Sequence, residues 1–177
     1  MRKWKLSPSQ GIALIIAQIV LIVNILVVPM VMAADISEGK AEAISTECSS
    51  IKDALKKIQK QDSKMRIYLG SKYEIVISNF MTNMNLRLIK NNIAAEEFTG
   101  LQTTFSSERE RFKADFTGYS QSLETLIGVD CQNEPQKFYE QLETVRAKRA
   151  DVQASYHRLI DVLGWHKEAV TGLKDEL

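Results

Sequence analysis

The chain has 177 residues, of which 45% are hydrophobic and 25% are charged, and its formal net charge at pH 7 is +1. This length allows one domain with an appended segment. Residues 1–33 carry three of the 23 basic side chains and none of the 22 acidic ones, so the remainder is slightly acidic. Such a body has no polybasic surface, which argues against nucleic acid as a partner. Three prolines and eight glycines are few, and this favours long helices.

The first segment, residues 1–33, is predicted to be a signal peptide or an N-terminal membrane anchor. A basic start is followed by an apolar run, by Pro29 and by a small-residue end, which is typical of a secretory signal peptide cut after Ala33. The alternative is an uncleaved anchor with a cytoplasmic N-terminus, because residues 11–34 are long enough to enter the membrane and span it. Either reading places residues 35–177 outside the cytosol, because the positive flank stays inside.

Apolar residues recur at alternating spacings of four and three in the next segment, which predicts one amphipathic helix over about 37–82. Its stripe contains Ile44, Cys48, Ile51, Leu55, Ile58, Asp62, Met65 and Leu69, drifts at Tyr73, and resumes at Val76 and Phe80. The pattern loosens at residues 81–85 and again at residues 90–92. We expect a turn or a short linking helix there.

Two further helices are predicted, over about 94–128 and about 135–173. The first has an apolar stripe from Phe98 to Leu126 and is followed by Gly128 and Pro135, which punctuate helices. The second keeps its spacing of four and three without a slip from Phe138 to Leu173. Together the three stripes predict an all-α fold: an elongated antiparallel three-helix bundle with coiled-coil-like seams, formed by residues 35–177.

The two cysteines of the predicted body, Cys48 and Cys131, are expected to form a disulfide. An even number of cysteines in an exported chain favours pairing. The helix register supports the same pair independently, since antiparallel packing of the second helix on the first brings residue 48 beside the loop that contains Cys131. Two buried free thiols are the alternative, and the spacing excludes a CxxC redox or metal site.

Polar residues interrupt the predicted seams at Asp62 and Arg149. The same register brings Asp115 of the second helix within half a turn of them. We therefore expect a buried polar layer of Asp62, Asp115 and Arg149 that specifies the register at some cost in stability. A proton or ligand site at these residues is the alternative interpretation.

No motif of catalysis, of metal binding or of cofactor binding stands out in the sequence. His157 and His166 are nine residues apart and do not form a ligand pair at helical spacing, and there is no glycine-rich phosphate loop. His166 faces the seam near Phe80 and Phe98, where a core histidine is the simplest interpretation. We expect a protein that is not an enzyme and that holds no cofactor and no metal.

Several short pieces of the chain form a recurring pattern. They are Cys48, "LGSKYE" at 69–74, "NLRL" at 85–88 and the run from Asp130 to Arg149. In these pieces, over roughly residues 45–163, the chain resembles uncharacterised exported helical proteins of ultrasmall, host-dependent candidate-phylum bacteria. The resemblance implies export to the cell envelope and paired cysteines, and it implies no known activity.

The last four residues, Lys174 to Leu177, spell the retention signal of the eukaryotic endoplasmic reticulum. The stripe of the third helix reaches Leu173, and the bacteria that the resemblance implies lack this organelle, so we expect the helix simply to continue.

The sequence favours a non-enzymatic protein of the cell envelope, secreted or membrane-anchored, that serves as a scaffold, spacer or module for a protein partner on the bundle surface. The alternatives are a membrane- or lipid-active helical protein and a luminal resident of the endoplasmic reticulum.

Overall fold

The computed structural model describes residues 36–176, and within that range it contains helices and no β-strand. The prediction of an all-helical fold is therefore confirmed for this part of the chain. The elements in chain order are α2 (Glu38–Thr46), α3 (Cys48–Ile75), the π-helix η1 (Val76–Met81), α4 (Thr82–Lys90), α5 (Glu96–Gly128) and α6 (Pro135–Glu176).

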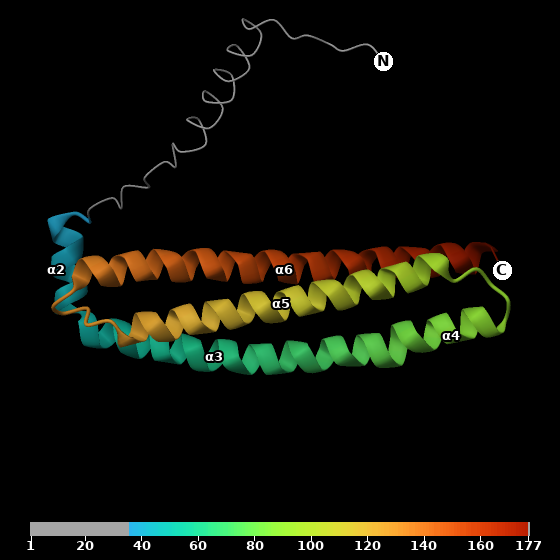
Figure 1. Cartoon of the computed structure of the whole chain (residues 1–177), viewed down its shortest axis with the longest axis horizontal. Coiled ribbons are helices and arrows are strands. Elements are labelled where there is room, and N and C mark those ends of the chain that lie inside the picture. Colours follow the sequence, from blue (N-terminus) through green and yellow to red (C-terminus); the bar gives the residue numbers. More distant parts are fainter. Residues whose placement is uncertain (1–35, 177) are drawn as a thin grey trace, which may run out of the picture. The chain divides into compact units, whose positions relative to one another are not determined.

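Three long helical stretches lie side by side in the described body (Figure 1). α3, η1 and α4 follow one another directly and form the first stretch, and α5 and α6 form the other two. The chain reverses direction at residues 91–95 and again at residues 129–134. α5 packs closely against α6, whereas no Cα atom of α3, η1 or α4 lies within 8 Å of one in α6. The first stretch and α6 thus meet through side chains only.

Large aromatic side chains of α5 explain this separation. Phe105, Phe112, Phe116 and Tyr119 are all buried in one core cluster, which also contains partly buried side chains from α3 and α6. The Tyr73 ring of α3 meets the rings of Phe105 and Phe112 edge-on, with centroids 5.8 and 5.7 Å apart. Aromatic rings of this size fill the space that closer backbone approach would require.

The first helical stretch differs from the prediction at the π-helix. We expected a turn or linking helix at residues 81–85, but the helix continues through η1 to Lys90. A π turn contains an extra residue, so the position one turn after Val76 falls five residues later, on Met81. Met81 is accordingly 1% exposed, while Phe80, which we expected in the seam, is 62% exposed.

The predicted disulfide is present between Cys48 and Cys131, whose Cα atoms are 5.5 Å apart. It joins the first turn of α3 to the loop between α5 and α6. Nearby, the Ser45 hydroxyl of α2 donates to the Gln132 carbonyl at 2.7 Å. α2 therefore holds the same loop, and Figure 1 shows it beside the start of α6.

Asp130 organises that loop. Its carboxylate accepts hydrogen bonds from the backbone N–H groups of Gln132 and Asn133, at 3.1 and 3.3 Å, and from the Asn133 side chain at 2.8 Å. The bonds from Asn133 lower the pKa of Asp130 below its ordinary value, because they favour the ionised carboxylate. The loop is thus fixed on both sides of Cys131.

Some predictions concern residues outside the described range. The expected signal peptide or anchor, residues 1–33, and the apolar run up to residue 34 lie there. Within residues 36–176, no helix combines the length and the apolar character that crossing a membrane requires. At the other end, the backbone of α6 is helical through Glu176, so three residues of the terminal tetrapeptide continue the helix.

Candidate functional site

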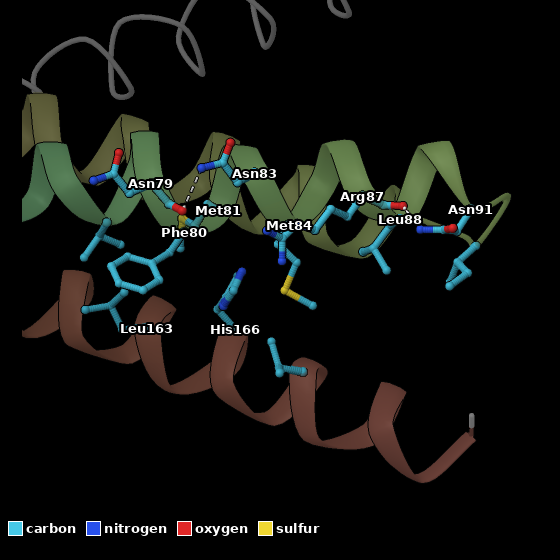
Figure 2. Close-up of a pocket in the computed structure, with 13 residues that line it drawn as sticks. Asn79, Phe80, Met81, Asn83, Met84, Arg87, Leu88, Asn91, Leu163 and His166 are labelled. Carbon is cyan, nitrogen blue, oxygen red and sulfur yellow. Dashed lines mark hydrogen bonds between the residues drawn. The ribbon is translucent and has the colours of Figure 1, made fainter.

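An open groove separates η1 and α4 from the C-terminal part of α6 (Figure 2). We call it the α4–α6 groove and define it by the lining residues between 76 and 93 on one wall and between 163 and 170 on the other. Its volume is about 750 Å³, within the range typical of small-molecule sites. The walls are mainly apolar, and their side chains include Phe80, Met84, Leu88, Leu163 and Val170.

The π-helix η1 forms the N-terminal part of the wall that α4 continues. π turns are rare and occur frequently at functional sites. Here the extra residue moves Phe80 out of the core and leaves it beside Leu163 across the groove. The groove thus begins at the one irregular turn of the first helical stretch.

A polar cluster beneath the groove holds α4 against α5. The buried Asn85 side chain donates to Gln102 Oε1 at 2.5 Å, and Gln102 Nε2 donates to the Thr82 hydroxyl at 2.9 Å. Next to it, the buried side chains of Leu88 and Phe98 belong to a second core cluster. This wall of the groove is therefore fixed by both hydrogen bonds and apolar packing.

His166 projects from α6 into the groove, between Phe80 and Met84 (Figure 2). Its ring meets Phe98 edge-on with centroids 5.8 Å apart, so the predicted proximity to Phe98 is confirmed, and His166 lines the same groove as Phe80. The buried Nε2 atom has no hydrogen-bond partner among the described residues. Burial lowers the pKa of His166 below 6.5, which keeps the imidazole neutral at neutral pH.

The polar rim of the groove has one sign of charge. Arg87 is the one charged side chain among the lining residues of the described groove, and no carboxylate lines it. Among the side chains that the structure describes, which end at residue 173, no acidic group lies within 4 Å of the Arg87 guanidinium. Asn91 donates to the Arg87 carbonyl at 2.8 Å and closes the end of the helix. Among these described side chains, the rim therefore presents one cation, Arg87, next to apolar walls.

The predicted polar layer is brought together only in part. Arg149 lies 3.9 Å from the Asp62 carboxylate, but its side chain is 53% exposed, so the layer is not buried as we expected. The backbones of α3 and α6 stay apart, which leaves this pair at the edge of a hollow between them. The tighter partner of Asp62 is Tyr119, whose hydroxyl donates to it at 2.6 Å.

Asp115 does not join that layer. Its carboxylate instead lies 3.9 Å from the Arg158 guanidinium, which also donates to Glu108 at 2.8 Å. Asp115 thus serves the α5–α6 interface rather than the α3–α6 contact. Sequence reasoning missed Tyr119 as a polar partner because its spacing marks it as a seam residue, and its hydroxyl became relevant only with the position of Asp62.

Comparison with protein-family models, with curated proteins and with solved structures finds no match for this chain. Among the described residues, no three His, Cys, Asp or Glu side chains gather closely enough to hold a metal ion.

Proposed function

We propose that the protein is a non-enzymatic binding module of the cell envelope, whose ligand is a small apolar molecule held in the α4–α6 groove. The observation that carries this proposal is the exposed Phe80 side chain on the wall of a largely apolar groove of about 750 Å³. Leaving so large an apolar ring in water is unfavourable, and a ligand that covers it gains the corresponding free energy.

The extracytoplasmic location is part of this proposal and has its own support. The Cys48–Cys131 disulfide suits an oxidising compartment, since disulfides are rare in the cytosol. The predicted leader, residues 1–33, and the resemblance to exported proteins of ultrasmall bacteria favour the same compartment. In this account the module is secreted, or anchored in the membrane by residues 11–34 if they are not cleaved.

We also interpret the body as an elongated antiparallel three-helix bundle, and its seams as coiled-coil-like. The support comes from α6, where the buried residues Phe138, Val145, Leu159 and Val162 are separated by 7, 14 and 3 residues, which are whole heptads or one helical turn. A rigid bundle of this kind holds the two walls of the groove at a fixed separation, which is what a preformed binding site requires.

Binding of an environment-sensitive naphthalene dye to the full chain tests the proposed function. Phe80→Glu places a charge in the groove and should weaken saturable binding about tenfold or more. Leu86→Glu is the matched control, because Leu86 is 59% exposed on the same stretch but does not line the groove. Equal loss of binding in the two variants, or in neither, would contradict the proposal.

A further inference from the structure

The α4–α6 groove has features that narrow the class of its ligand. Its side chains on the first stretch recur about once per turn, at Val76, Phe80, Met84, Arg87 and Asn91. At about 1.5 Å per residue, this row extends over roughly 20 Å. A row of this length, with one side chain per turn, can line an extended ligand such as a hydrocarbon chain better than a compact ring system.

The opposite wall is shorter. On α6 the lining residues are Leu163, His166 and Val170, which occupy about two turns. A partner helix about 10 Å across would need apolar contacts over more turns on both walls, as helix-in-groove recognition uses anchors at four successive positions. A single hydrocarbon chain is thinner than a helix, so the apolar side chains that line the two walls are enough to cover it. Met84 favours it further, because the flexible methionine side chain adapts to irregular apolar shapes.

The single positive charge of the groove, on Arg87, favours a ligand with an anionic head group. The Arg87 guanidinium is the single charged group among the groove's described lining residues, and no carboxylate lines the groove beside it. A guanidinium binds a carboxylate through two parallel hydrogen bonds. His166 adds a buried nitrogen that lacks a partner, and Figure 2 shows Arg87 about one turn beyond Met84, which faces that histidine. One cation beside an apolar channel complements a monoanion with a single tail.

We propose that the α4–α6 groove binds a single-chain fatty acid, with its tail along Phe80, Met84 and Leu163 and its carboxylate on Arg87. This inference rests on the proposed function, because it names the ligand of the same groove. It adds a residue, Arg87, whose role is to discriminate the acid from uncharged amphiphiles of equal length.

Competition against the naphthalene dye tests this inference on the full chain. We expect hexadecanoate to displace the dye about tenfold more effectively than hexadecanol, since only the acid pairs with a guanidinium. Arg87→Gln should abolish this preference and leave dye binding measurable. Lys90→Gln removes a neighbouring cation of α4 that does not line the groove and should preserve the preference.

The two proposals fail in distinguishable ways. If the dye binds and Phe80→Glu prevents it, but acid and alcohol compete equally, the binding module stands and the fatty-acid inference is overturned. A preference for the acid that survives Arg87→Gln would also overturn it, as would tighter competition by a lysophospholipid of the same chain length. If the dye does not bind saturably at all, the proposed function itself fails.

Discussion

At the scale of single residues, two tyrosines of the core show how differently a buried hydroxyl can be accommodated. The Tyr73 hydroxyl is buried without a hydrogen-bond partner among the described residues, and the Tyr119 hydroxyl donates to Asp62 at 2.6 Å. Burial raises the pKa of Tyr73 to about 12. Burial first, and then the bond to Asp62, raise the pKa of Tyr119 as well.

Removing these hydroxyls should change stability in opposite directions. Tyr73→Phe deletes an unsatisfied polar group and should raise the free energy of unfolding by about 1 kcal/mol. Tyr119→Phe removes the donor to the Asp62 carboxylate and should lower it by about 1–2 kcal/mol. Urea unfolding followed by circular dichroism measures both values. Equal changes of the same sign would contradict the hydrogen-bond assignment.

His166 should make stability depend on pH. The pKa of His166 is lowered by burial in the folded chain, so the unfolded chain binds more protons over the window near and below 6.5. The free energy of unfolding should therefore fall as the pH is lowered through about 6.5, the ordinary pKa of a histidine in the unfolded chain.

Two matched variants test whether His166 causes this pH dependence of the free energy of unfolding. His166→Gln should flatten the pH dependence in that window, whereas His157→Gln, at an exposed position of the same helix, should leave it in place. The carboxyls of Asp130 and Glu110 have lowered pKa values, so their protonation belongs to a more acidic range. An unchanged pH profile in His166→Gln would show that another group is titrating.

At the scale of elements, η1 shows which part of the fold spacing alone could predict. The steady spacing from Phe138 onward was sufficient to predict α6, and the two cysteines with the helix register were sufficient to predict their bond. Regular spacing could not predict the five-residue step from Val76 to Met81, since an α-helix places Phe80 on that face instead. The groove was missed for a related reason: it depends on how far the α5 aromatics hold the other helices apart.

Deleting one residue distinguishes the π turn from ordinary α-helix. Removing Ser78, which is exposed within η1, should convert the π turn into α-helix and keep Met81 on the core face, so stability should change by only about 1 kcal/mol. Removing the exposed Ser71 of α3 rotates Met81 and Leu88 away from α5 and should cost several kcal/mol. Thermal unfolding that is equally impaired in both deletions would contradict this reading of η1.

At the scale of the whole molecule, the disulfide is the one covalent link between distant parts of the described body. It closes an interval of 83 residues and, in the chain-entropy model, contributes about 4.5 kcal/mol. Reduction should therefore lower the urea midpoint of unfolding substantially. The Cys48→Ser, Cys131→Ser double variant should reproduce that lowering without a reductant.

The same bond can be checked in the full chain by alkylation and intact-mass measurement. We expect the two cysteines to react only after reduction. Alkylation without reduction would contradict the disulfide and weaken the argument for an oxidising compartment.

Photoaffinity labelling with a diazirine-bearing fatty acid tests whether the α4–α6 groove is a ligand site. The full chain is labelled, digested and mapped by peptide mass spectrometry. We expect labels on residues 76–93 and 163–170, which excess hexadecanoate removes. Labels confined to residues 1–35, or spread over the outer face of α3 and insensitive to competition, would contradict it.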